Sequence, residues 1–193
     1  MLYESSLRVV RLKDDLNDII QGCIKGKRGS QEILYQMYSA KMFGVCFRYC
    51  RNYDESKDIL QEGFIKVFEK IYQFGNKGSF EGWVRRIIVN TALEKYRMQI
   101  RTVQLDYLAE VRAEENEEIE LNISLNEMLA LIQKLPDQYR LVFNMYAFEN
   151  MTHKDIAQQL GITEGTSKSD LSRARAILQK KICLKTGMVA KIG

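Results

Sequence analysis

Residues 151–181, MTHKDIAQQLGITEGTSKSDLSRARAILQKK, hold the strongest structural pattern of the chain. Thr152 can cap a first helix, because its hydroxyl would accept a hydrogen bond from a free N–H group of the first turn. Gly161 can end that helix, since glycine adopts the left-handed conformation at no steric cost. Thr163 can cap a second helix, with Ile162 filling the angle between the two. The stretch therefore predicts a helix-turn-helix.

The second predicted helix has an apolar side and a polar, cationic side. Spacings of i, i+4, i+7 and i+11 define an inward stripe of Ser167, Leu171, Ala174 and Leu178. The outward set is polar and basic, as a helix in a DNA major groove requires. It comprises Thr166, Ser169, Ser172 and Arg173, with Lys168 and Arg175 on the flanks and Glu164 in the first turn. An ordinary amphipathic hairpin would look similar, so this stretch alone leaves both interpretations open.

Composition favours an all-α fold, and the length is enough for one or two small helical domains. The chain has 193 residues, is 46% hydrophobic, and contains 12 glycines but one proline. Few helix breakers predict long helices, and no segment of any length alternates as a strand does. No apolar run approaches the ~20 residues of a membrane span, and no signal peptide is apparent. We therefore expect a cytoplasmic protein without membrane insertion.

The four cysteines predict reduced thiols rather than a metal site. Cys46 and Cys50 lie one helical turn apart, whereas Cys23 and Cys183 are isolated in the sequence. A single histidine and the absence of a CxxC motif argue against bound zinc. Cysteine is among the residue types most often buried, so we predict buried thiols and no metal or other cofactor.

Charge alternates along the chain, although the net charge is only +4. Residues 85–101 are basic, residues 106–120 are strongly acidic, and residues 163–181 are basic again. This alternation indicates two nucleic-acid surfaces joined by an acidic connector.

The N-terminal half reads as consecutive amphipathic helices. The pattern is helical from Asp15 to about Arg51, with a break at residues 26–29. A further helix over residues 55–74 places its apolar side chains on one face. Its other face exposes Asp58, Gln61 and Glu62. An acidic and amide surface of this kind has a binding role only if a basic partner exists.

Ser79 can cap the next helix, which carries the only tryptophan. Arg86, Asn90 and Arg97 lie opposite the predicted buried stripe at i, i+4 and i+11, and Phe80 and Trp83 lie beside the preceding loop. Aromatic side chains next to cationic and amide groups are typical of surfaces for single-stranded or opened DNA. A core tryptophan beside a solvated basic face explains the residues equally well.

Periodicity is lost over residues 98–120 and returns from about Leu121. Pro136 breaks the first of the later helices and Asp137 opens another. We therefore predict a domain over residues 15–97, an acidic linker over 98–120, and a second domain over 121–185.

Three segments together resemble the extracytoplasmic-function (ECF) group of the bacterial RNA polymerase sigma-70 family. DESKDILQEGFIKVFEKI looks like the helix of sigma region 2, and SFEGWVRRIIVNTALEKYR resembles the region that opens and reads the −10 element. LPDQYRLVFNMYAFENMTHKDIAQQLGITEGTSKSDLSRAR is similar to region 4, which reads the −35 element. The resemblance covers roughly residues 15–183.

The resemblance implies an alternative sigma factor without enzymatic activity, catalytic residues or cofactor. It implies two contacts with core RNA polymerase, at the β′ clamp helices and the β flap, and binding to promoter DNA and an anti-sigma factor. Asp58, Gln61 and Glu62 match the β′-contacting face. The −10 set would be Phe80, Trp83, Arg85, Arg86, Asn90 and Arg97. Region 4 would place Glu164 to Arg175 in the −35 major groove, and the acidic linker would thread the polymerase cleft rather than act as a solvated spacer.

Asp170 departs from the family pattern, because many relatives carry a basic or uncharged polar residue there. Helical geometry predicts that it lies on the flank of the recognition helix, where it could pair with Arg173 or Arg175. A carboxylate near phosphates lowers DNA affinity, although it can accept a hydrogen bond from a cytosine amine.

Three other functions compete with the sigma factor. A stand-alone helix-turn-helix regulator would bind duplex DNA without polymerase, but it would leave the basic helix and acidic linker without a role. A small nuclease would need a constellation of carboxylates or histidines, whereas His153 is the only histidine and reads as an exposed first-turn residue. A protein that sequesters polymerase or an anti-sigma factor would not need Asn90, Lys168 and Arg173.

Overall fold

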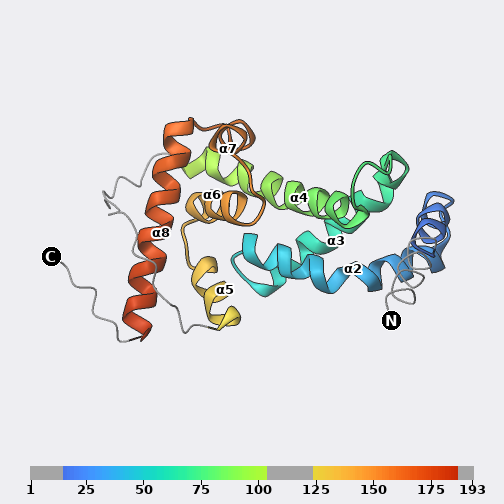
Figure 1. Cartoon of the computed structure of the whole chain (residues 1–193), viewed down its shortest axis with the longest axis horizontal. Coiled ribbons are helices and arrows are strands. Elements are labelled where there is room, and N and C mark those ends of the chain that lie inside the picture. The colour runs from blue at the N-terminus through green and yellow to red at the C-terminus, as the bar shows by residue number, and fades with distance from the viewer. Residues whose placement is uncertain (1–14, 104–123, 187–193) are drawn as a thin grey trace, which may run out of the picture. The chain divides into compact units, whose positions relative to one another are not determined.

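The structure is a computed structural model that describes residues 15–103 and 124–186. The described residues contain helices and turns and no β-strand, which confirms the all-α prediction. No helix among them is long and apolar enough to cross a membrane. Figure 1 shows the helices. They comprise a helix over residues 15–24, α2 (Arg28–Tyr49), α3 (Tyr53–Lys70), η1 (Ile71–Gln73), α4 (Phe80–Val103), α5 (Leu125–Gln133), α6 (Asp137–Ala147), α7 (His153–Leu160) and α8 (Glu164–Thr186).

The chain divides into two compact units. Unit 1 comprises Met1–Cys46 and Lys57–Thr91, and unit 2 comprises Phe47–Ser56 and Ala92–Gly193. Both units contain parts of α2, α3 and α4. The division into compact units falls within α4, between Thr91 and Ala92, whereas the predicted domain boundary lies at residue 97.

Unit 1 is built on the apolar faces of its helices. Its core includes Leu34 and Met42 from α2, Leu60 and Val67 from α3, and Ile88 from α4, all at most 6% exposed. The close approach of α3 and α4 depends on the absence of a side chain at Gly63, where a Cβ atom would lie 2.4 Å from Cδ1 of Ile88.

Unit 2 packs α5, α6 and α7 against the long helix α8 (Figure 1). The stripe predicted on α8 is buried, with Ala174 fully enclosed and Leu171 and Leu178 at most 5% exposed. Burial of an apolar side chain of this size contributes about 1.5–3 kcal/mol. One core cluster consists of Leu131, Ile132, Leu135, Ala174, Leu178 and Ile182.

Side chains from α5 and α6 cap the C-terminal carbonyl groups of α2 within unit 2. The last carbonyls of a helix have no partner inside it, so they need donors from elsewhere. The side-chain amides of Gln133 and Asn144 donate to the carbonyl oxygens of Phe47 (3.0 Å) and Arg48 (2.9 Å). Nε of Arg140 donates to the carbonyl oxygen of Tyr49 at 2.9 Å.

Two predicted boundaries differ from the structure, and two predicted segments lie outside the described residues. Helix α4 continues to Val103, so the first six residues of the predicted linker, 98–103, are helical. The acidic stretch over residues 106–120 and the N-terminal residues 1–13 lie outside the described residues. Ser124 caps α5 through a capping box with Glu127, so the helix begins slightly later than Leu121.

The prediction of buried thiols is confirmed for three of the four cysteines. Cys23, Cys46 and Cys50 are buried, and Cys183 is half-buried. Burial raises the pKa of the Cys50 thiol to about 12, so this group stays protonated at neutral pH. Within the described residues, no group of His, Cys, Asp and Glu side chains could hold a metal ion.

Candidate nucleic-acid interface

The turn between α7 and α8 has the geometry predicted for a helix-turn-helix. Thr152 and Asp155 form a capping box at the start of α7. Gly161 adopts the left-handed conformation (φ 70°), and its N–H donates to the carbonyl of Ala157 at 2.9 Å. Oγ1 of Thr163 accepts from the N–H of Thr166 at 3.0 Å at the start of α8. The motif is therefore stabilised by local hydrogen bonds that its own sequence provides.

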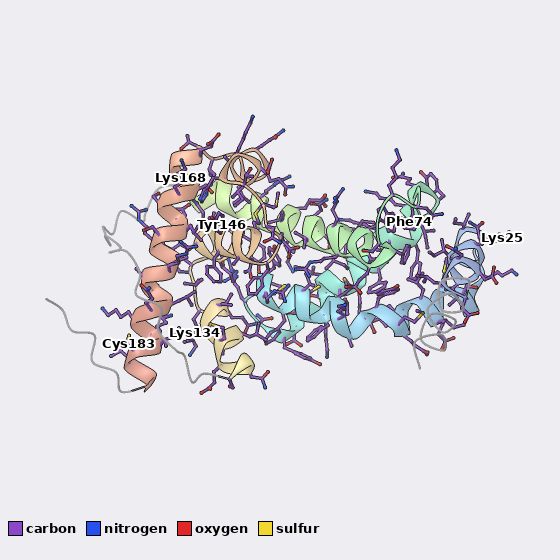
Figure 2. All side chains as sticks on the ribbon, in the orientation of Figure 1. Lys25, Phe74, Lys134, Tyr146, Lys168 and Cys183 are labelled. Atoms are coloured by element: carbon purple, nitrogen blue, oxygen red, sulfur yellow. The ribbon has the colours of Figure 1, made fainter. Side chains whose placement is uncertain are left out.

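The side of α8 opposite the core carries the predicted −35 residues. Figure 2 shows Lys168 near the end of α8 that adjoins α7, and Cys183 near the other end. Four of the predicted residues are exposed, namely Glu164, Lys168, Ser169 and Arg175. Three are half-buried, namely Thr166, Ser172 and Arg173. A polar, cationic strip on a helix that follows a tight turn can enter a major groove.

The predicted position of Asp170 is wrong, because this residue is only 2% exposed. Its carboxylate accepts a hydrogen bond from Nε2 of Gln138 at 2.6 Å and lies 4.0 Å from Nη1 of Arg173. Of the two arginines that the sequence allowed, Arg173 is thus its partner. Helix α6 covers this side of α8, and the sequence spacing of α8 alone does not show that.

His153 joins α7 to α8 instead of standing free in the first turn. Its Nδ1 lies 2.9 Å from Oγ of the buried Ser167, and its ring stacks on Tyr146 with centroids 4.9 Å apart. The guanidinium of Arg175 also lies over the ring of Tyr146, 5.6 Å from its centroid. Burial and the charges of Lys168 and Arg175 lower the pKa of His153 below its ordinary value, although Glu164 acts in the opposite direction. The imidazole is therefore neutral at pH 7.

Helix α4 presents the predicted −10 residues. Arg86 and Asn90 are exposed in unit 1, Trp83 and Arg85 are half-buried there, and Arg97 is half-buried in unit 2. The Nε atom of Arg97 is buried and has no hydrogen-bond partner among the described residues. Arg86 and Asn90 are four residues apart and so share one face of the helix.

Phe80 belongs to the core rather than to an accessible surface, which corrects its predicted role as a DNA contact. It is 4% exposed, and its ring centroid lies 5.0 Å from that of Phe74, 5.6 Å from that of Trp83 and 5.7 Å from that of Tyr38. Aromatic pairs at these separations stabilise the fold beyond the area that they bury. Phe80 therefore holds the start of α4, while the half-buried Trp83 keeps an accessible part.

The acidic and amide face of α3 is exposed as predicted. Asp58, Gln61 and Glu62 all lie on the surface of unit 1. Glu62 forms an ion pair with Lys66 at 2.7 Å across one turn of the helix. Exposed pairs of this kind contribute about 0.3–0.5 kcal/mol, so the pair leaves Glu62 available to another cation.

The sequence did not identify Gln138, Tyr139 and Tyr146 as neighbours of the recognition helix. All three lie on α6, and their partners Asp170, Arg173 and His153 are 34 residues or fewer away. The periodicity of α6 separates its buried face from its exposed face. It contains no signal for which polar side chains would face α8.

The fold and these surfaces define a helical protein of the DNA-binding class, with a helix-turn-helix in one region and an exposed basic helix in the other. A family model for sigma-70 region 2 matches residues 34–102, and a model for sigma-70 region 4 matches residues 125–178. The chain belongs to the extracytoplasmic-function group of the sigma-70 family, and it is an alternative RNA polymerase sigma factor.

The relatives cover most of the chain. It is 29% identical over 174 residues to the ECF RNA polymerase sigma factor SigW of Bacillus subtilis, with 81% of this chain and 92% of the relative covered. The chain is 27% identical over 180 residues to the ECF RNA polymerase sigma-E factor of Haemophilus influenzae, with 85% of this chain and 93% of the relative covered. A solved structure shows the sigma factor RpoE in complex with the anti-sigma factor NepR from Bartonella quintana. The matched chain is 20% identical in sequence, with a TM-score of 0.48, and the match covers 77% of this chain and 94% of that chain.

Proposed function

We propose that this sigma factor binds core RNA polymerase through α3, reads the −35 element with α8, and holds the opened −10 element on α4. The observation that carries the proposal is the exposed strip of Lys168, Ser169 and Arg175 on a helix whose opposite side is buried. Such a helix combines rigid support with exposed polar and cationic groups, which base readout in the major groove requires. The chain would act in the cytoplasm and would have no catalytic activity of its own.

Region 4 would contribute both affinity and sequence preference. Lys168 and Arg175 would neutralise phosphates, and Lys168 or Arg173 would contact base edges. A good bidentate contact is worth about 1–3 kcal/mol against the wrong base. Because the two DNA-reading regions belong to one chain, binding of one raises the effective concentration of the other. Two weak sites would then be occupied together only at the correct promoter spacing.

Region 2 would stabilise the opened −10 strand. Asn90 is an exposed amide that can hydrogen-bond the edge of an unpaired base, and Arg86 on the same face can hold the backbone. Extruding a base costs a few kcal/mol of stacking, which contacts with the protein must return. Arg85 and Arg97 would add backbone contacts.

Docking on polymerase would use the exposed carboxylates of α3. Complementary charge raises the rate of association and orients the two surfaces. The β′ clamp helices would receive Asp58, Gln61 and Glu62, and the β flap would receive region 4. We also propose an anti-sigma factor as a partner, in keeping with the family.

The substitution Glu62→Lys is expected to weaken binding to core polymerase about tenfold, because charge reversal places like charges together at the interface. Affinity is measured by fluorescence anisotropy of labelled protein titrated with core enzyme. The matched control is Glu32→Lys on α2. Glu32 is likewise exposed and has a partner one helical turn away, because its Oε1 accepts a hydrogen bond from Nε2 of Gln36 at 3.4 Å. Equal losses in both variants would mean that α3 is not the docking face.

The pKa of His153 is expected to lie below its ordinary value in the free protein and to rise when −35 DNA binds. The nearby cations Lys168 and Arg175 disfavour the imidazolium, whereas DNA phosphates would favour it. The protonated fraction at pH 6 should therefore increase on binding. Since the chain has one histidine, proton NMR of the untagged protein follows this residue alone.

The lowered pKa of His153 makes the free energy of unfolding depend on pH. The unfolded chain binds the proton more readily than the folded chain. The stability linked to His153 is therefore present above about pH 6.5 and is lost as pH falls below it. Lys168→Ala should raise the pKa of His153 in the free protein. An unchanged pKa would show that Lys168 does not act on the imidazole.

The proposal as a whole is tested with core RNA polymerase and a promoter library. The tagged chain is expected to copurify with core enzyme and to direct transcription from a defined set of start sites, whose alignment reveals two promoter elements. Binding to duplex DNA without binding to core enzyme would instead establish a stand-alone regulator.

A further inference from the structure

A buried carboxylate inside a DNA-recognition helix requires a reason. Asp170 is 2% exposed and lies between α6 and α8. Burial raises the pKa of the Asp170 carboxyl above its ordinary value, while the hydrogen bond from Gln138 and the charge of Arg173 act in the opposite direction. Burying a charged group costs free energy unless it is paired and hydrogen-bonded. The residue therefore opposes stability unless its partners return that cost.

The partner of Asp170 on the same helix is Arg173, which the proposed function places among the −35 contacts. Oδ1 of Asp170 lies 4.0 Å from Nη1 of Arg173, and the same Nη1 lies 3.4 Å from the hydroxyl oxygen of Tyr139. The side chain of Arg173 is 27% exposed. Its guanidinium is thus restrained from one side by a carboxylate of α8 and a hydroxyl of α6.

The restraint leaves part of the guanidinium for a ligand. Arginine presents five N–H donors in a planar fork, and a bidentate contact with guanine or a phosphate uses two of them. Both restraining groups contact Nη1. Within the described part of the chain, the edge formed by Nε and Nη2 therefore stays available.

We propose that Asp170 is a positioning residue for −35 recognition, which holds the guanidinium of Arg173 in the orientation that reads the DNA. The inference rests on the proposed function that α8 binds the −35 element. A free arginine side chain loses rotamer freedom when it binds, and a side chain already held in its bound orientation loses less. The carboxylate thus contributes to sequence discrimination without touching DNA.

This role differs from the effect of a carboxylate that merely repels phosphates. Removal of a repelling charge would strengthen binding to every DNA sequence alike. Removal of a positioning charge would reduce discrimination at the base pair that Arg173 reads and leave the other base pairs unaffected. The two roles therefore predict different changes in a sequence-resolved measurement.

The test uses holoenzyme assembled from core RNA polymerase and the full chain, with a promoter library whose −35 element is randomised. Asp170→Asn retains the shape of the side chain and an oxygen acceptor for Gln138 but removes the charge. It is expected to reduce preference about fivefold at the positions where Arg173→Ala also reduces it. Tyr139→Phe, which removes one hydroxyl, should cause a smaller reduction at the same positions.

The matched control is Asp54→Asn, which makes the same charge change at an exposed residue of α3. It should retain the wild-type preference at every position. Thermal melts of each variant verify folding. A second measurement needs no DNA: the Nε–H resonance of Arg173 in the free protein should broaden or shift in Asp170→Asn.

Each outcome has one meaning. Loss of preference confined to the Arg173 positions supports the positioning role. A uniform gain or a uniform loss across all positions, or an unchanged Nε–H resonance, overturns it while the sigma function stands. Failure of the wild-type holoenzyme to select any −35 sequence would overturn the proposed function itself, and the inference with it.

Discussion

Replacement of Arg140 by methionine is expected to reduce the free energy of unfolding of unit 2 by about 3–5 kcal/mol. The side chain is 1% exposed. Its guanidinium donates to the carbonyl oxygens of Tyr49, Leu135 and Gln133 at 2.9, 3.0 and 3.2 Å, and to Oδ1 of Asp137 at 2.7 Å. Methionine fills a similar volume but leaves these acceptors without a donor. A buried polar group that loses its partner costs about 1–3 kcal/mol.

The matched control for this prediction is Arg51→Met. Arg51 also hydrogen-bonds Asp137, through Nε at 3.0 Å and through Nη2, but its side chain is 49% exposed. Water can replace these contacts, so the expected loss is at most about 1 kcal/mol. Urea unfolding followed by circular dichroism measures both variants. A loss below about 1 kcal/mol for Arg140→Met would mean that the capping of α2 contributes little.

The Arg140 and Arg51 contacts also predict a dependence on pH. Burial alone would raise the pKa of Asp137, but hydrogen bonds from Arg51 and Arg140 lower it below its ordinary value. A carboxyl whose pKa is lowered by folding contributes stability above its ordinary pKa and loses it as pH falls. The contribution of Asp137 should therefore disappear in acid, below about pH 4.

The substitution Asn90→Ala is expected to reduce the fraction of opened promoter complex about tenfold while affinity for core polymerase changes less than twofold. Base contacts of this kind are worth about 1–3 kcal/mol, which corresponds to roughly 5- to 150-fold. Asn90 is exposed on α4, whereas the predicted docking residues belong to α3. Permanganate reactivity of unpaired thymines measures opening, and anisotropy measures polymerase affinity.

Gln36→Ala provides the control for Asn90→Ala. Gln36 is an exposed amide on α2 that belongs to none of the proposed sites. Its loss should leave both opening and polymerase affinity unchanged. If Asn90→Ala lowers the two quantities equally, the residue acts in assembly of the holoenzyme and the assignment to the −10 strand is wrong.

The helical elements could be predicted because their signals are local. Thr152 caps α7, Gly161 ends it in the left-handed conformation, and Asp137 opens α6 directly after Pro136. Each of these events depends on hydrogen bonds or dihedral angles within a few residues. The apolar stripes of α3 and α8 were also correct, because burial of one helix face follows from its periodicity.

The end of α4 was less predictable for the same physical reason. Helix α4 continues to Val103 although the apolar periodicity stops near residue 98. Apolar periodicity reports which face of a helix is buried, and it does not specify where the helix ends. The pattern of α4 therefore did not locate the end of the helix.

The sequence by itself determined the all-helical fold, the helix-turn-helix, and the identity of the exposed faces on α3, α4 and α8. Only the tertiary structure decided which polar side chains meet: Asp170 faces Gln138, and Arg140 reaches the end of α2. It also decided that Phe80 is enclosed by aromatic rings. A helical repeat specifies the direction of a side chain around its own axis. The partner in that direction comes from another helix, whose placement depends on the packing of the whole unit.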